Sequence, residues 1–240
     1  MINPEVALSA ESTKSNYNAG TPFPHTVIDN FLDPSVIDMA AMEAELLVNN
    51  KDEHGWRFNP ADEHKDQILK KGISDISKMP PIIQLICIYM NNPQFIEIIR
   101  NLTGIDDLIG DPTFTGGGLH VTESGGKLGI HHDFTDHFIN GSHYYRQVNV
   151  LIYLNRRWDQ TWGGNLELWK PNLSESVKTI PIEFNKGIIF NIDDAPHGHP
   201  DPLDCPKGET RRSLAFYYYS KKKTVNNFSR AWWKDGLDYT

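Results

Sequence analysis

The chain has 240 residues, of which 39% are hydrophobic and 22% are charged, and its formal net charge is −8. This composition allows a buried core and excludes wholesale disorder, and the acidic balance argues against a nucleic-acid backbone as the main partner. Two cysteines, Cys87 and Cys205, are too few and too far apart for a disulfide framework or a zinc site. No stretch approaches the ~18 consecutive apolar residues of a membrane span, and the polar start lacks the apolar core of a signal peptide, so we expect a cytoplasmic location.

The first part of the chain predicts a leader, a strand and a helix. Residues 1–20 are polar and rich in Ser, Asn and small residues, which is typical of a flexible leader. The run HTVIDNFL (25–32) predicts a short apolar strand. Asp33 as N-cap and Pro34 at the first helical position then predict a helix that continues to about Leu47.

Two further helical patterns complete the N-terminal part. They are IIQLICIYM, which follows Pro80-Pro81, and QFIEIIRNL, which follows Pro93. Gly104 comes shortly after the second pattern, where a helix C-cap is expected. We therefore expect three helices before residue 112.

From about residue 112 the pattern changes to short β-like runs separated by Gly, Pro, Asn and Asp. Seven or eight strands are expected, in the runs GLHVT, KLGIHHDF, QVNVLIYL, NLELW, TIPIEF, GIIFNI and RRSLAFYYYS. The lack of helices between them excludes a parallel βαβ sheet and predicts an antiparallel sandwich or jelly roll, a mainly β fold whose N-terminal helices buttress one outer face. The tail, 221–240, begins with three lysines and carries Trp232-Trp233, which we expect to pack back on the domain.

A His-x-Asp pair lies in the segment ESGGKLGIHHDFTDH. Residues i and i+2 of an extended segment point to the same side, so the imidazole of His131 and the carboxylate of Asp133 converge. His197 follows the apolar strand GIIFNI, and a neighbouring jelly-roll strand could bring it close as a third ligand. Two imidazoles and one carboxylate bind Fe(II) on one triangular face and leave the other positions open for a cosubstrate and dioxygen. Alone, however, His-x-Asp is explained equally well by a surface histidine beside a capping aspartate.

A second feature lies on the last predicted strand, TRRSLAFYYY, which places Arg211 and Ser213 on one face, fourteen residues after His197. A planar guanidinium suits the distal carboxylate of a dicarboxylic acid, and the serine hydroxyl can add a hydrogen bond. A solvent-exposed strand arginine is the ordinary alternative for Arg211. The complete order of metal pair, strand, third histidine and Arg-x-Ser is much harder to obtain by accident.

Residues 112–220 resemble the double-stranded β-helix of the iron(II)- and 2-oxoglutarate-dependent oxygenases, and most closely the prolyl-hydroxylase branch, which includes the oxygen-sensing prolyl hydroxylases. The segments that carry the resemblance are GIHHDF, RQVNVLIYLNRRWD, GGNLELW, APHGHP and TRRSLAFYYY. The tract YLNRRWD, followed by GG and an apolar strand, is specific to that branch. The resemblance implies a single oxygenase domain over 21–240, with a strand and supporting helices (21–111), the β-helix core (112–220) and a tail (221–240).

By position, the resemblance implies three iron ligands, which are also the catalytic residues: His131, Asp133 and His197. Arg211 then matches the basic residue that holds 2-oxoglutarate, with Ser213 as a further contact. Tyr153, within IYLN, matches a tyrosine whose hydroxyl reaches the same carboxylate, and its alternative is a core strand tyrosine. The implied cofactors are Fe(2+), 2-oxoglutarate as cosubstrate and O2, with ascorbate as a candidate reductant. An aspartate at the middle ligand favours hydroxylation, because the related halogenases have a small residue there.

The sequence also departs from this branch. Ten residues before His131, where the branch carries another cosubstrate-binding tyrosine, this chain has Val121. His120 and Asn149 are the candidates that could supply that contact instead. The segment DPLDCPKGE, between the third histidine and the arginine, is longer than the branch leads us to expect and predicts a rim loop.

Several other histidines compete with the predicted ligands. His132 points away from His131 on a strand and is a weak candidate. His199 shares the side of His197 if their segment is extended, so the preference for His197 rests on its A-P-H context. The remaining candidates are interpreted as local polar or pocket residues: His120, His137 and His143.

The resulting hypothesis is hydroxylation of an unactivated C–H bond, with a prolyl residue of a protein or peptide as the first candidate substrate, from the resemblance alone. A free amino acid or small metabolite is the alternative. The loops 134–146 and 199–210 would decide whether the site is an open groove, which suits a peptide, or a closed pocket, which suits a metabolite. A non-catalytic cupin-like binding module and a zinc hydrolase are further readings, and the complete triad with Arg211 argues against the first.

Overall fold

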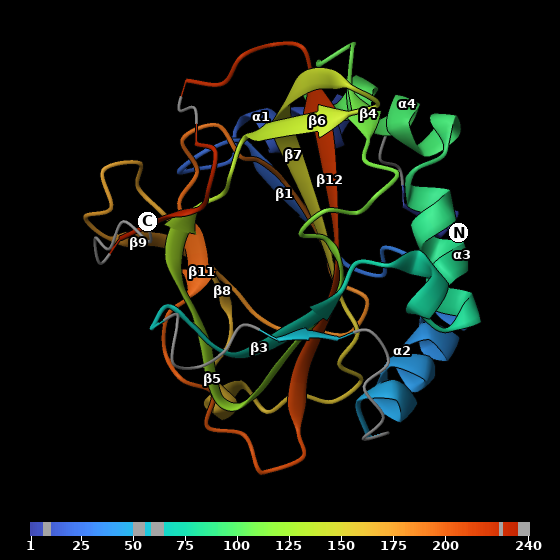
Figure 1. Ribbon diagram of the computed structural model, residues 1–240, viewed down its shortest axis with the longest axis vertical. Coiled ribbons are helices and arrows are strands. Elements are labelled where there is room, and N and C mark those ends of the chain that lie inside the picture. Colours follow the sequence, from blue (N-terminus) through green and yellow to red (C-terminus); the bar gives the residue numbers. More distant parts are fainter. Residues whose placement is uncertain (7–10, 50–55, 59–64, 226–227, 235–240) are drawn as a thin grey trace.

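The computed structural model describes residues 1–6, 11–49, 56–58, 65–225 and 228–234. Helices lie along one side of a strongly curled antiparallel sheet (Figure 1). The helical elements are α1 (Glu11–Asn18), α2 (Pro34–Asn49), α3 (Pro81–Met90) and α4 (Pro93–Thr103), with 3-10 turns η1 (Ile76–Lys78) and η2 (Gln160–Trp162).

Thirteen strands are found in the described part of the chain. The first seven are β1 (His25–Ile28), β2 (Arg57–Phe58), β3 (Gln67–Ile73), β4 (Ile109–Gly110), β5 (Gly118–His132), β6 (Asp136–Ile139) and β7 (Ser142–Tyr153). The others are β8 (Leu166–Trp169), β9 (Ser176–Ile180), β10 (Gly187–Asn191), β11 (His197–His199), β12 (Thr210–Ser220) and β13 (Trp232–Trp233).

The order of the main path is β1-β10-β7-β12-β5-β11-β8-β9, with every pair antiparallel. Strand β5 joins the two halves of this path, because its first part pairs with β12 and β3 and its last part pairs with β11 and β13. Buried side chains from β7, β8, β9 and β10 pack together in one cluster, so the two halves face each other. This is the predicted jelly roll, and the expectation of an antiparallel, mainly β core is confirmed.

The period of two along the strands separates a core face from a cavity face. On β7, Val148, Val150 and Ile152 are fully buried in the core cluster that the helices share. The residues between them, Asn149 and Leu151, line a cavity inside the curl of the sheet. Helix residues such as Ile37, Ile83 and Phe95 complete the outer core, so the helices buttress one face of the sheet as predicted.

Local signals set the helix ends as the sequence predicts. The Asp33 carboxylate accepts hydrogen bonds from the backbone N–H groups of Ser35 (2.9 Å) and Val36 (3.4 Å) before α2. Gly104, with φ of 73°, follows α4 in the left-handed region, and its N–H donates to the Arg100 carbonyl.

Part of the predicted leader is folded. Within residues 1–20, residues 11–18 form α1, and Tyr17 on this helix is only 2% exposed. Tyr17 belongs to the same core cluster as the helices α2 to α4. The polar composition of the segment hides this single anchoring aromatic, which is why the pattern predicts a flexible leader. Residues 7–10 lie outside the described residues.

Across the residues that the structure describes, no single helix has the length and apolar character needed to cross a membrane. Helices α3 and α4 meet that test only as a pair, and they are bent by 52° where they meet.

Candidate metal centre

Two histidines face each other across neighbouring strands. His131, near the end of β5, is directly opposite His197, the first residue of β11, and the ring centroids lie 4.7 Å apart. The His131 Nδ1–H donates to the Gly129 carbonyl at 2.9 Å, and the His197 Nδ1–H donates to the Ala195 carbonyl at 2.9 Å. Because a carbonyl can only accept, Nδ1 of each ring carries a proton, so in a neutral imidazole the lone pair is on Nε2.

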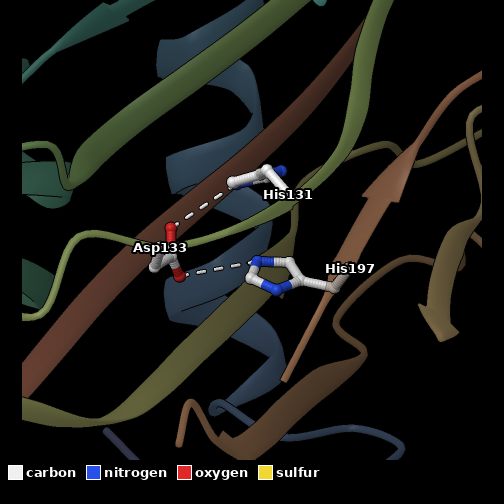
Figure 2. Close-up of side chains that lie close together, drawn as sticks. All are labelled: His131, Asp133 and His197. Carbon is white, nitrogen blue, oxygen red and sulfur yellow. Dashed lines mark ion pairs between the residues drawn. The ribbon is translucent and has the colours of Figure 1, made fainter. Parts of the chain in front are cut away.

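The Asp133 carboxylate points at both free nitrogens (Figure 2). Its Oδ1 lies 3.5 Å from His131 Nε2, and its Oδ2 lies 3.6 Å from His197 Nε2. One atom from each of the three residues lies within 4.8 Å of the others. Asp133 follows β5 directly, so the i, i+2 geometry of an extended segment brings it to the side of His131.

Two further side chains hold this carboxylate in place. The Asn149 amide donates to Asp133 Oδ2 at 2.8 Å, and Arg146 Nη2 lies 2.9 Å from the same oxygen. Arg146 Nε also donates to Asn149 Oδ1 at 2.8 Å, which links the two into one network. Burial alone would raise the pKa of Asp133, but the Arg146 guanidinium and the two histidines hold it well below the usual value. The carboxylate is therefore ionised, and Oδ1 remains available to a metal.

Arg146 is itself fully enclosed, with 1% of its surface exposed. Its guanidinium lies over the ring of Tyr217, 3.2 Å from the centroid, and 5.0 Å from that of Phe134. A buried guanidinium needs a carboxylate and aromatic faces of this kind, because it cannot lose its proton. Neither composition nor spacing distinguishes Arg146 from a surface arginine of YYRQVN, so the sequence prediction missed it.

His197 and Asp133 are in the protonation states that a divalent metal requires. Burial lowers the pKa of His197 to about 4, even though Asp133 raises it. The imidazole is therefore neutral at pH 7, with its lone pair on Nε2. Two neutral imidazoles and one ionised carboxylate on one side of a cavity fit the facial arrangement of non-haem iron(II), with the other positions open. The residues present thus fit the metal that the sequence predicted.

Three of the predicted cosubstrate residues, Asn149, Arg211 and Ser213, line the same cavity, which has a volume of about 170 Å³, whereas Tyr153 is buried in an apolar cluster. Arg211 and Ser213 of β12 line it together with the three ligands. The Arg211 Nη2–H donates to the Tyr153 hydroxyl at 3.1 Å, and its Nε–H donates to the Gly164 carbonyl at 2.8 Å. Ser213 is in register with Tyr153. The structure brings Arg211, Ser213 and Tyr153 together, and their role in holding 2-oxoglutarate remains a prediction.

Val121, which stands where the branch has a tyrosine, and the two candidates for the missing contact, His120 and Asn149, lie in different places. Val121 is fully buried on the helix side, whereas its neighbour His120 lines the cavity. Asn149 lines the cavity too, but its oxygen and one N–H are engaged with Arg146 and Asp133, so its predicted cosubstrate contact stays a prediction.

The competing histidines are not part of the metal cluster found in the described residues. His132 points away and packs near Phe228 and Trp232. His199 is 2% exposed and lines the cavity, and neither of its ring nitrogens has a hydrogen-bond partner in the described part of the chain.

The described part of the C-terminal tail packs back on the domain, as predicted, and lies beside the metal ligand His131. Strand β13 pairs with the end of β5 and places Trp233 opposite His131. The two rings are stacked, with centroids 4.7 Å apart and an interplanar angle of 29°. Trp233 is only 4% exposed, so it shields one side of the imidazole from water.

Comparisons with known proteins agree with this geometry. Residues 117–219 match the 2OG-Fe(II) oxygenase superfamily. No curated protein matches the sequence.

Among solved structures, the chain is similar to a prolyl-4-hydroxylase of Pseudomonas putida, with a TM-score of 0.60 and 17% identity over 88% of this chain and 99% of that one. A Trichoplax adhaerens prolyl hydroxylase in complex with a hypoxia inducible factor peptide fragment has a TM-score of 0.55 and 16% identity, over 90% and 94% of the two chains. HygX of Streptomyces hygroscopicus, with nickel, 2-oxoglutarate and hygromycin B bound, has a TM-score of 0.58 and 12% identity, over 90% and 89%.

At these identities the solved structures establish the fold, and the family model matches the β core in sequence. That match covers the two histidines, the aspartate and the arginine. Residues 117–219 therefore match the 2OG-Fe(II) oxygenase superfamily, and the metal ligands within them fit iron(II) with 2-oxoglutarate as cosubstrate.

Proposed function

We propose that this protein is an Fe(II)- and 2-oxoglutarate-dependent dioxygenase that hydroxylates an unactivated C–H bond, most readily that of a prolyl residue in a protein or peptide. The observation that carries the activity is the convergence of the His131, Asp133 and His197 ligand atoms within 4.8 Å, in a cavity that also contains Arg211. The prolyl substrate is supported by the fold, which is similar to prolyl hydroxylases, one of them crystallised with a peptide.

Each cavity residue has a defined task in this proposal. The two Nε2 atoms and the Asp133 carboxylate hold the iron. Arg211 and Tyr153 bind the distal carboxylate of 2-oxoglutarate, since a buried guanidinium and a phenol form charge-assisted hydrogen bonds with it. When bound, iron, 2-oxoglutarate and O2 supply an oxidation that yields succinate, CO2 and a substrate with one added oxygen atom. The protein orients both substrates and excludes water with Trp233 and the cavity walls.

One observation favours the alternative, a free amino acid or another small metabolite. A cationic side chain, Lys70, lines the cavity in addition to Arg211 and Arg146. A small substrate with its own carboxylate would complement that extra charge.

Conversion of 2-oxoglutarate to succinate by the purified protein with Fe(II) tests the activity directly. We expect slow conversion without substrate, and its loss in Asp133→Ala, because a metal ligand is removed. Asp136→Ala is the matched control, since Asp136 pairs with His143 and lies outside the metal cluster. Turnover at the wild-type level in Asp133→Ala would show that the metal site is misassigned.

The substrate itself requires an unbiased search. Peptide libraries and metabolite extracts are incubated with the protein, and mass spectrometry identifies products that have gained one oxygen atom. Oxygen on proline in peptides would support the prolyl assignment. Oxygen only on free metabolites would replace it with the alternative.

A further inference from the structure

A row of side chains crosses three strands on the cavity side of the sheet. Thr122 of β5 is in register with Arg211 of β12 on one side and with Lys70 of β3 on the other. Residues directly opposite in antiparallel strands point to the same face, so Lys70 and Arg211 face the same cavity with one strand between them. Both of them line the cavity that contains the metal ligands.

Lys70 also lines a second cavity, of about 190 Å³, which adjoins the first. Four residues are shared by the two and therefore mark their junction: Gln67, Lys70, Gly116 and His120. The metal ligands and Arg211 line only the inner cavity. A substrate that extends from the metal site toward the outer cavity must therefore pass Lys70.

Lys70 is half-buried, and its ammonium has no hydrogen bond or ion pair with any residue in the described ranges. The carboxylate whose charge acts on Lys70 is that of Asp133, and it is already paired with Arg146. Burial, together with the neighbouring charge of Arg211, lowers the pKa of Lys70 to about 8. An unpaired cation in this position costs free energy in the empty cavity, and an anionic ligand offsets that cost.

The cosubstrate does not account for this cation. One carboxylate of 2-oxoglutarate belongs with the metal, and the other has Arg211, Tyr153 and Ser213 on the β12–β7 side of the cavity. Lys70 lies on the opposite side of β5, on β3. The chain as a whole is acidic, so a cavity whose junction carries an unpaired cation is a local feature and not a consequence of net charge.

We propose that Lys70 is a specificity-determining residue that holds a carboxylate of the primary substrate at the junction of the two cavities. This inference rests on the proposed function, because it names the substrate class of the same site. The carboxylate belongs either to a free amino acid or small organic acid, or to an acidic side chain of a peptide beside the oxidised residue.

Binding to the protein loaded with Mn(II) and 2-oxoglutarate tests the proposal without turnover. The probes are two matched pairs that differ only in charge: L-proline with L-prolinamide, and a capped peptide with proline beside glutamate with its glutamine counterpart. In the wild type, we expect the carboxylate member of at least one pair to bind roughly tenfold to a hundredfold more tightly than the amide, as a charge-assisted hydrogen bond allows. Preference in the first pair identifies a free acid, and preference in the second identifies an acidic peptide.

Lys70→Met should remove that preference, because methionine keeps the length of the side chain and removes the charge. Lys71→Met is the matched control, since Lys71 is already paired with Glu123 at 2.8 Å. The affinity for 2-oxoglutarate should be the same in wild type, Lys70→Met and Lys71→Met. The proposal is overturned if neither pair shows a preference in the wild type, if Lys70→Met retains it, or if Lys70→Met weakens 2-oxoglutarate binding, which would make Lys70 a cosubstrate residue.

A second measurement uses only the wild type, in case Lys70→Met does not fold. Acylation of Lys70 by a neutral reagent is followed by peptide mass spectrometry in the protein with Mn(II) only, then with 2-oxoglutarate added, and then with 2-oxoglutarate and a probe. The preferred carboxylate probe should slow the labelling of Lys70, whereas 2-oxoglutarate alone should leave it unchanged; the opposite pattern contradicts the proposal. Neither binding nor labelling depends on turnover. A failure to form succinate would therefore refute the proposed function, whereas the role of Lys70 is tested by binding and labelling alone.

Discussion

At the scale of single residues, the atoms available to a metal are those that do not already form hydrogen bonds or ion pairs with the protein. His131 and His197 each use Nδ1 on a backbone carbonyl, and Asp133 uses Oδ2 on Asn149 and Arg146. The atoms left over are two Nε2 lone pairs and one carboxylate oxygen, and they lie on one side of the cavity. Outer hydrogen bonds of this kind fix the tautomer and the orientation of a ligand before any metal arrives.

Arg211 is expected to act on cosubstrate affinity. Arg211→Ala removes a charge-assisted contact, so the dissociation constant of 2-oxoglutarate should rise by roughly tenfold to a hundredfold. Arg212→Ala is the matched control, because Arg212 points to the other face of β12, toward Glu45 at 3.8 Å. Isothermal titration of Mn(II)-loaded protein with 2-oxoglutarate measures both variants. An unchanged affinity in Arg211→Ala would exclude this residue from the cosubstrate site.

Asn149 allows two predicted roles to be separated. If it positions Asp133, Asn149→Leu should weaken Mn(II) binding by roughly 10–100-fold and change 2-oxoglutarate affinity little at saturating metal. If it contacts the cosubstrate, the reverse pattern is expected. The geometry favours the first outcome, because its amide already donates to the carboxylate. Equal metal affinity in Asn149→Leu and wild type would contradict a positioning role.

The sequence predicts those site residues whose spacing along the chain, or whose match to a known family, indicates a role. The i, i+2 rule brings His131 and Asp133 together, and the resemblance to a known family adds His197. Arg146 and Lys70 could not be predicted in this way, since a strand pattern does not reveal which basic side chain lies inside the curl of a sheet. Their places depend on strand register between segments far apart in the chain.

At the scale of elements, the site depends on the close approach of β5 and β11. Gly198 sits between the two histidines of β11, and a Cβ there would lie 2.5 Å from the Gly129 carbonyl oxygen and 2.7 Å from that of Leu128. Both contacts are with backbone, so no side-chain rotation could relieve them. The absence of a side chain at Gly198 is therefore what allows His197 to lie directly opposite His131.

The C-terminal strand β13 should contribute to both stability and metal affinity. Trp233→Ala removes a 4%-exposed side chain that is stacked on His131, so we expect a loss of about 3 kcal/mol in the free energy of unfolding and weaker Mn(II) binding. Trp232→Ala is the control, because Trp232 is 39% exposed and is not stacked on a ligand. Urea unfolding and metal titration measure the two effects. Equal results for both variants would remove Trp233 from the site.

Helices were easier to predict than strand boundaries. Asp33 and Gly104 are explicit start and stop signals, and both perform the expected capping. By contrast, the segment 134–146 was expected to be a loop, and it contains β6 and the start of β7 as a hairpin. The runs GLHVT and KLGIHHDF form one strand, β5, because the glycines between them sit in a strand that pairs on both sides. In the sequence, turn residues inside one long, bent strand look the same as turn residues between two separate strands.

At the scale of the whole molecule, the curled sheet separates an apolar outer face, covered by helices, from a polar inner face that carries the chemistry. The net charge of the whole chain is −8, whereas the inner cavity is lined by three basic side chains, Lys70, Arg146 and Arg211, and by one carboxylate, that of Asp133. Net charge therefore says little about the ligand of this protein. The distribution of charge inside the fold predicts that the ligands are anions.

The proposed activity requires that three side chains from two distant stretches hold a single iron ion, which 2-oxoglutarate then joins. Anaerobic titration of purified protein with Fe(II), with and without 2-oxoglutarate, tests it most directly. We expect one iron per chain and 2-oxoglutarate binding that tightens when iron is present. In His197→Ala we expect a loss of iron affinity larger than the roughly 10–100-fold that follows from losing an outer hydrogen bond. Iron binding of wild-type strength in His197→Ala, or none in the wild type, would contradict it.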